Sequence, residues 1–204
     1  MYPRRMMVVG SILVVSAVAI FVLAVTMARD EENLIGRAVP FNGATGAVKQ
    51  GDLVVVEGKV SAKNKILIHD FVDAASERQI KGGSWTTLKL FRQPVLADLA
   101  NGEIMLNADF PCAGAKGNNV LMTGEKTEGN REIRYIGLRR GDPVTAVGTL
   151  ASVNPASLTV KNWYSGSVSE YRESLSSTGR NSYIFCAILV ITGAGMFALG
   201  FRKR

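Results

Sequence analysis

The single histidine of this chain lies among acidic residues. His69 is followed directly by Asp70, and Asp73 and Glu77 come shortly after it. A histidine beside carboxylates can act as a general base or contribute a ligand to a divalent metal. A metal site, however, normally needs more than one histidine or a converging set of carboxylates. Solvated residues at a strand end explain this cluster best, and an envelope hydrolase or metal-assisted enzyme using His69, Asp70 and Asp73 is the alternative.

Two other features could carry chemistry, and both are incomplete. Cys112 follows Pro111 in a glycine-rich stretch, but the neighbouring sequence supplies no histidine to activate the thiol. Residues 114–129 contain several glycines but lack the Gly-x-x-x-x-Gly-Lys-Ser/Thr order of a phosphate-binding loop. We therefore expect no catalytic residue, no cofactor and no metal site, and we predict that the chain is not an enzyme.

Two uncharged segments frame the part of the chain that holds these residues. Residues 6–28 contain no charged side chain and, at about 1.5 Å per helical residue, reach roughly 34 Å, enough to cross a hydrocarbon core of about 30 Å. Residues 183–201 are also uncharged and are just long enough. We expect two transmembrane helices. A cleaved signal peptide is the alternative for the first, although its apolar region exceeds the usual length of a signal.

The distribution of charge predicts the orientation and excludes one class of partner. Arg4 and Arg5 precede the first segment and basic residues 202–204 follow the second, so the positive-inside rule places both termini in the cytoplasm. The middle of the chain is then extracytoplasmic. The net charge of +7 owes much to these terminal residues. Because the middle is nearly neutral, we expect no nucleic-acid partner.

Between the two segments, the sequence is β-rich and contains a repeat. Residues 51–60, Gly-Asp-Leu-Val-Val-Val-Glu-Gly-Lys-Val, are similar to residues 141–150, Gly-Asp-Pro-Val-Thr-Ala-Val-Gly-Thr-Leu. Each copy begins with a Gly-Asp turn and continues as a strand. Gly58 and Gly148 interrupt these strands, where a bulge or a sharp bend would let a sheet curl. The pattern predicts a small OB-like β-barrel.

Turn residues and alternation predict the remaining elements. Asn101-Gly102 indicates a tight hairpin. Trp163 and Tyr164 close the last strand and suit a barrel rim or a membrane interface. An envelope-polymer binder that stacks sugars on Trp85 or Trp163 is a third functional hypothesis. We expect strands over 65–71, 85–90, 131–138 and 157–161, a hairpin over 95–106, a loop or short helix over 73–83, and a loop over 109–130.

Three stretches of the sequence resemble the beside-a-membrane domain, also called the GIDE domain, of membrane-anchored ubiquitin ligases and their prokaryotic relatives. They are residues 51–60, the hairpin 95–106 with Asp98 and Gly102, and the run 132–148. The resemblance implies a β-rich domain between two transmembrane helices that binds a partner. Those ligases also carry a RING finger, which needs a set of cysteine and histidine zinc ligands. With two cysteines and one histidine, this chain is not expected to be a RING ligase.

The predicted fold is mainly β, with an OB-like small β-barrel domain between two transmembrane α-helices. We predict a non-catalytic scaffold or adaptor of the cell envelope that binds a protein or peptide through the barrel groove or an exposed strand edge. The lipid bilayer is its other partner, and the oligomeric state is not specified. The expected parts are cytoplasmic residues 1–5, transmembrane helix 6–28, a juxtamembrane connector 29–50, the OB-like domain 51–164, a serine-rich linker 165–182, transmembrane helix 183–201 and cytoplasmic residues 202–204.

Overall fold

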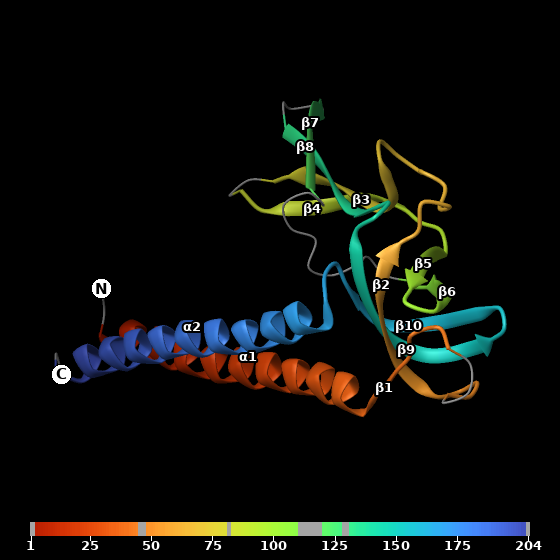
Figure 1. Ribbon diagram of the computed structural model, residues 1–204. Helices are drawn as coiled ribbons and strands as arrows, with labels where there is room; N and C mark the ends of the chain where they lie inside the picture. The colour runs from red at the N-terminus through yellow and green to blue at the C-terminus, as the bar shows by residue number, and fades with distance from the viewer. Residues whose placement is uncertain (1–2, 45–47, 81–82, 110–119, 128–130, 203–204) are drawn as a thin grey trace. The chain divides into compact units, whose positions relative to one another are not determined.

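The computed structural model describes residues 3–44, 48–80, 83–109, 120–127 and 131–202, and the chain separates into two compact units (Figure 1). One unit, Met1–Asn33 with Arg172–Arg204, is helical. The other, Leu34–Tyr171, is built mainly of strands. The β-rich unit contains a closed barrel and a second sheet.

A closed five-stranded barrel forms the larger part of the β-rich unit. The pair formed by residues 102–107 and 156–164 is parallel, and the other pairs around the ring are antiparallel. A short strand, β1 (Val39–Pro40), adds in parallel to residues 53–60. The prediction of a small β-barrel is therefore confirmed. Around the ring the order is β2 (Leu53–Val60), β5 (Val95–Leu99), β6 (Gly102–Asn107), β10 (Ala156–Tyr164) and β9 (Pro143–Val153), which pairs again with β2.

Aliphatic side chains and one tryptophan fill the barrel. Alternate residues of β5 and β6 point inward, and Ile104 and Leu106 are fully buried. Trp163 is 2% exposed within the same cluster, and Tyr164 is also buried. Trp163 belongs to the core cluster, so its predicted position at a rim or a membrane interface is wrong, whereas Tyr164 stacks on Tyr171 with the two ring centroids 5.0 Å apart.

The two copies of the Gly-Asp repeat pair with each other. Strands β2 and β9 run antiparallel over the length of the repeat. Gly51 N donates to Leu150 O at 2.8 Å, and Gly141 N donates to Val60 O at 2.7 Å, so each turn closes the far end of the other copy's strand. Both glycines have a positive φ, 93° and 84°, which other residues adopt only with strain. The repeat is therefore the seam that closes the barrel.

Gly58 and Gly148 are required where neighbouring strands approach closely. A Cβ atom on Gly58 would lie 2.4 Å from Asp98 O, and one on Gly148 would lie 2.1 Å from Thr159 O. The β9–β10 register shifts beside Gly148, which is the expected bulge. At Gly58 the ladders are regular, and the missing side chain instead lets β5 pass close to β2.

A second, four-stranded sheet is inserted into the barrel sequence. Strands β3 (Phe71–Gln79) and β4 (Trp85–Phe91) follow β2, while β7 (Val120–Thr127) and β8 (Arg131–Arg139) follow β6. They pair in the order β4-β3-β8-β7, and every pair is antiparallel. The sheet has its own small apolar cluster, centred on Phe71, Ala74 and Tyr135. Figure 1 shows the sheet beyond the barrel strands.

The predicted strand over 65–71 and loop over 73–83 are wrong. Residues 65–67 form no strand, Ile68 makes one bridge to Phe71, and β3 begins at Phe71. The polar composition of β3 concealed it, because the partner of a charged side chain such as Glu77 comes from a distant strand: Glu77 pairs with Arg134 of β8 at 2.8 Å. The predicted loop over 109–130 contains strand β7, whereas the strands predicted over 85–90, 131–138 and 157–161 and the hairpin over 95–106 are confirmed.

Two long helices, α1 (Pro3–Arg37) and α2 (Val168–Arg202), extend into the predicted connector and the predicted linker. Helix α1 continues through the charged residues that follow its apolar part and ends within the connector 29–50. Helix α2 begins at Val168, so most of the serine-rich linker 165–182 is helical. Its serines are compatible with a helix because a capping pair, Ser167 and Glu170, fixes its first turn.

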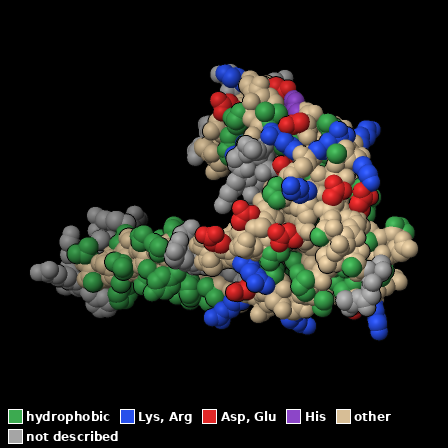
Figure 2. Space-filling view, viewed as in Figure 1, with side chains coloured by type: hydrophobic (Ala, Val, Ile, Leu, Met, Phe, Trp, Pro, Cys, Tyr) green, Lys and Arg blue, Asp and Glu red, His purple; other side chains and the backbone are tan. Residues whose placement is uncertain are grey.

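Within the part of the chain that the structure describes, α1 contains one segment long and apolar enough to cross a membrane, Val8–Arg37. An N-terminal signal sequence has the same properties. The apolar part of α2, Tyr183–Leu199, is shorter. Figure 2 shows hydrophobic side chains along this helical unit. One candidate span is therefore found, and the second span and the orientation stay predictions.

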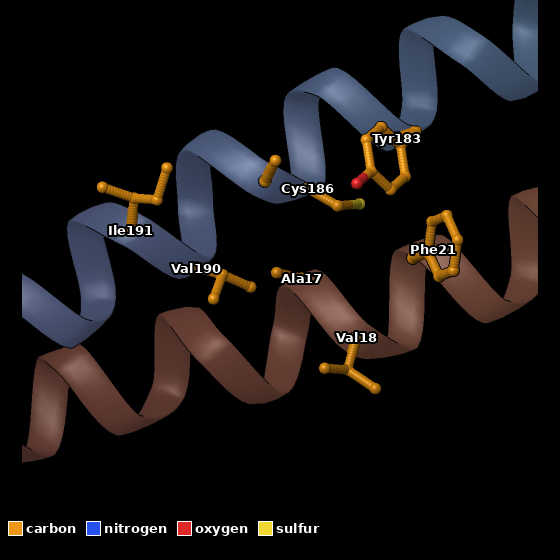
Figure 3. Close-up of a pocket in the computed structure, with 8 residues that line it drawn as sticks. Ala17, Val18, Phe21, Tyr183, Cys186, Val190 and Ile191 are labelled. Carbon is orange, nitrogen blue, oxygen red and sulfur yellow. The ribbon is translucent and has the colours of Figure 1, made fainter.

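Small residues bring the two helices into contact. A Cβ atom on Gly10 would lie 2.6 Å from Gly193 O, and one on Gly193 would lie 2.8 Å from Gly10 O. Further along, the rings of Phe21 and Tyr183 meet edge to face with centroids 6.1 Å apart. Ala17 and Cys186 lie beside these rings in an apolar groove of about 300 Å³ (Figure 3). Close backbone approach at small residues is the packing that membrane helices favour.

Candidate functional site

The structure separates the acidic residues that surround His69 in the sequence. Asp70 pairs with Arg139 at 2.8 Å, and Glu77 pairs with Arg134. The His69 ring contacts the Tyr135 ring edge to face, with centroids 4.5 Å apart. No hydrogen bond or ion pair between His69 and these acids is found among the described residues, and an enzyme that uses His69, Asp70 and Asp73 stays an untested alternative.

Metal and thiol chemistry find no support in the described part of the chain. Within it, no group of three or more histidine, cysteine, aspartate or glutamate side chains could hold a metal ion. Cys112 lies outside the described residues, as does half of the glycine-rich segment 114–129. Cys186, the other cysteine, is buried in the helical unit.

The two tryptophans considered as sugar platforms differ in exposure. Trp163 is buried in the barrel core and offers no face to a ligand. Trp85 is partly exposed, and the guanidinium carbon of Arg134 lies 4.1 Å from the centroid of its ring, over one face. A sugar platform at Trp85 stays a prediction.

A cleft with polar and apolar lining, named here the Arg92 cleft, lies at the start of β5 and the end of β6. It has a volume of about 350 Å³ and is lined by Arg92, Gln93, Pro94, Asn107, Ala108 and Asp109. The side chain of Gln93 fixes one wall, because its Nε2 donates to Lys65 O at 2.5 Å and to Val72 O at 3.1 Å. The cleft therefore combines a cation, a carboxylate and an amide on an anchored segment.

Asp73 is a buried acid next to this cleft. It is 3% exposed and lies on β3, where residues 74 and 91 are paired and so bring Asp73 near Arg92. Burial raises the pKa of Asp73 to about 6, and the positive charge of Arg92 opposes this shift. Asp73 is therefore protonated more readily than an ordinary aspartate.

Arg92 has hydrogen-bonding capacity that the described structure leaves unused. Its Nε and Nη2 atoms are buried and have no hydrogen-bond partner. Leaving a buried charged donor unpaired costs more than the roughly 1–3 kcal/mol typical of a neutral one.

Sequence reasoning identified Asp73 but missed Arg92. The signal available was the polar pair Arg92-Gln93 between two apolar strands and directly before Pro94. Such a pair is also ordinary in an exposed turn. Only the register of β3 against β4 shows that Arg92 lies beside a buried acid.

A second feature of this unit is the exposed edge of the four-stranded sheet. Among the described residues, β4 pairs only with β3. Leu88 and Leu90 on this strand are 46% and 44% exposed. An edge strand that exposes both unpaired backbone groups and apolar side chains can pair with another extended segment.

These observations define the chain as a β-barrel protein with an inserted sheet and an apolar N-terminal helix. It matches no protein-family model, no curated protein and no solved structure. The resemblance to the GIDE domain stays a prediction, and function is argued from the β4 edge and from Trp85.

Proposed function

We propose that this protein is a membrane-anchored, extracytoplasmic scaffold or adaptor, without catalytic activity, that docks an extended segment of a partner protein along β4. The exposed edge of β4 supports this proposal most directly. Its unpaired backbone groups would supply the affinity, and its side chains the specificity, as in other cases where a peptide adds a strand to a sheet.

The side chains of β4 favour a particular kind of partner. Leu88 and Leu90 offer apolar contacts, and Lys89 stands between them with its Nζ 4.9 Å from the centroid of the Phe91 ring. Two β4 strands paired at Lys89 would bring like charges together, which destabilises a strand pair. An extended segment that carries apolar and acidic residues is therefore the proposed occupant, in preference to a second copy of this chain.

The barrel belongs to the OB-like class in this proposal, with the four-stranded sheet as an elaboration of it. The closed ring, with its one parallel pair between β6 and β10, supports that assignment. The second transmembrane span and the cytoplasmic position of both termini are also proposed, on the basis of the apolar part of α2 and the basic residues at the two ends.

Site-specific crosslinking tests the docking proposal. A photoreactive amino acid at Thr87, on the exposed edge, is expected to yield a discrete adduct with another protein in native membranes. The same amino acid at Thr159, which is exposed on barrel strand β10, serves as the matched control and should not yield it. The double variant Leu88→Asp, Leu90→Asp should lose the adduct while retaining the circular dichroism spectrum of the parent.

Two results would overturn the docking proposal. The first is an adduct that forms equally from Thr87 and Thr159. The second is an adduct that contains only this chain, which would identify the edge as a contact between copies.

Labelling of single cysteines tests the orientation. With Cys112 and Cys186 replaced by serine, Thr159→Cys should react with a membrane-impermeant maleimide in intact cells. A cysteine added after Arg204 should react only after lysis. The reverse pattern would place the β-rich unit in the cytoplasm.

A further inference from the structure

We propose that the partly exposed ring of Trp85 binds a neutral sugar ring of a glycan chain, while the polar side chains around it hold the sugar hydroxyls. This site lies on one face of the four-stranded sheet, whereas the docking proposal concerns the edge of that sheet, so neither depends on the other. The inference rests on the exposure of Trp85, the register of the strands and the ion pair beside the ring.

The register of the strands gathers polar side chains around Trp85. In the β3–β4 pair, Trp85 is opposite Gln79 and Thr87 is opposite Glu77. Glu77 is in turn opposite Arg134 of β8. Side chains at opposite positions, or two apart along a strand, lie on the same face of a sheet. The aromatic ring and these polar side chains therefore share one small area of the face.

The ion pair between Glu77 and Arg134 fixes the ring and neutralises the nearest cation. Arg134 Nε and Nη2 lie 2.9 Å and 2.8 Å from Glu77 Oε2. The guanidinium so held lies over one face of the Trp85 ring, with its carbon 4.1 Å from the ring centroid. Because Arg134 already has a carboxylate partner, the site favours a neutral ligand over an acidic one.

Polar groups beside the ring are available to a ligand. The indole N–H of Trp85 makes no hydrogen bond to the described residues, and it is not one of their buried unpartnered donors, which all belong to arginines. Both contacts of the ion pair use Glu77 Oε2, so Oε1 can accept a further hydrogen bond. Thr87 is exposed and can donate or accept. Sugar hydroxyls, which both donate and accept, match this set.

A sugar ring also matches the indole itself. The electron-rich face of an indole attracts the weakly positive C–H groups on one side of a pyranose ring. With Arg134 over one face of Trp85, the sugar stacks on the other, and its hydroxyls project sideways toward Glu77 and Thr87. An aliphatic side chain of a protein partner would cover the ring but would leave these polar groups unpaired.

Titration of the full-length chain in lipid nanodiscs, followed by NMR, tests the proposal. The chain has two tryptophans and so two indole N–H resonances, and Trp85→Phe identifies the one from Trp85. The probes are the β-1,4-linked trimers of glucose and of N-acetylglucosamine, and the tighter one identifies the type of sugar. The Trp85 resonance should shift with a dissociation constant on the order of millimolar, as expected of a shallow site. The resonance of buried Trp163 is the internal control and should not shift.

Variants show whether the ring itself binds the sugar. Trp85→Ala should weaken binding at least about tenfold, measured through the backbone amides of β3 and β4. If Trp85→Ala unfolds the chain, Trp85→Phe keeps a smaller ring and should weaken binding about threefold. Lys89→Gln is the matched control on the same strand. Lys89 is opposite Ser76, the neighbour of Glu77, and so lies on the other face of the sheet. This variant should bind like the parent.

Three results would overturn the proposal. The first is that neither trimer shifts the Trp85 resonance up to roughly 50 mM, which is well above the expected dissociation constant. The second is an equal shift with sorbitol, which carries similar hydroxyls but has no ring to stack. The third is tighter binding of a trimer of galacturonic acid, because Arg134 would then act as a free cation.

Discussion

Asp52 and Asp142 occupy equivalent positions in the two copies of the repeat and make the same contact. The Oδ2 atom of Asp52 accepts from Lys49 N at 2.7 Å, and that of Asp142 accepts from Arg139 N at 2.6 Å. Each carboxylate therefore ties its turn to the chain that enters it. This contact explains why aspartate follows glycine in both copies, since aspartate is the residue that hydrogen-bonds to nearby backbone in turns.

We predict that Asp52→Ala and Asp142→Ala each lower the free energy of unfolding by about 1 kcal/mol, the usual net value of one such hydrogen bond. Because the turns flank the same β2–β9 seam, the double variant should lose more than either single variant. Chemical denaturation of the full-length chain measures these values. Asp98→Ala, at an exposed position of β5, is the control and should be neutral. Equal stability of all four chains would contradict the prediction.

The repeat was the most informative part of the sequence because its structure is local. Gly-Asp turns and Val-rich strands specify conformation through neighbouring residues, and the Asn101-Gly102 hairpin does so in the same way. These elements were predicted correctly. The two copies also pair with each other to close the barrel. This pairing depends on long-range packing, which the sequence of one strand alone does not predict.

Strand β3 illustrates the limit of that approach. Its polar residues indicated a loop, because their partners come from β8, far along the chain, as with Glu77 and Arg134. The surroundings of Asp73 were unpredictable for the same reason. Asp73 was recognised as an acid, but its burial and its proximity to Arg92 arise only when β3 and β4 pair. Local sequence patterns do not predict such long-range contacts.

We predict that Gly58→Ala and Gly148→Ala destabilise the barrel strongly. The new methyl groups would meet backbone oxygens at 2.4 Å and 2.1 Å, and a strand held by its ladder cannot move away without breaking hydrogen bonds. A loss of about 2–3 kcal/mol is expected from overpacking of this kind. Gly36→Ala is the matched control, because a Cβ there would meet nothing within 4 Å. If all three variants melt at the parent's temperature, the close approaches do not exist in solution.

The raised pKa of Asp73 makes stability depend on pH. Burial moves this pKa from 3.8 to about 6, so between these values the folded chain holds a proton that the unfolded chain releases. The free energy of unfolding should therefore fall as pH rises through this window. Above about pH 6 the ionised Asp73 should cost on the order of 2–3 kcal/mol.

We predict that Asp73→Asn stabilises the chain at pH 7.5 and changes little near pH 4, because asparagine is neutral like the protonated acid. Thermal denaturation of the full-length chain at the two pH values measures this difference. Asp98→Asn, at an exposed position, should have no effect at either pH. If Asp73→Asn is less stable than the parent at pH 7.5, the ionised Asp73 stabilises the fold by pairing with Arg92 in solution instead of destabilising it.

The start of α2 gives a last prediction. Ser167 N donates to Glu170 Oε2 at 2.7 Å, and Glu170 N donates to Ser167 Oγ at 3.2 Å, a reciprocal cap. The donors of Ser167 hold the pKa of Glu170 below its ordinary value of 4.5, so this stabilisation is present above pH 4.5 and is lost as pH falls through the lowered value.

We predict that Ser167→Ala lowers the free energy of unfolding by about 1 kcal/mol and that amide exchange in the first turn of α2 accelerates. Ser176→Ala removes only a hydroxyl bond to Glu173 O inside the helix, and equal exchange in both variants would show that the cap does not hold the helix start.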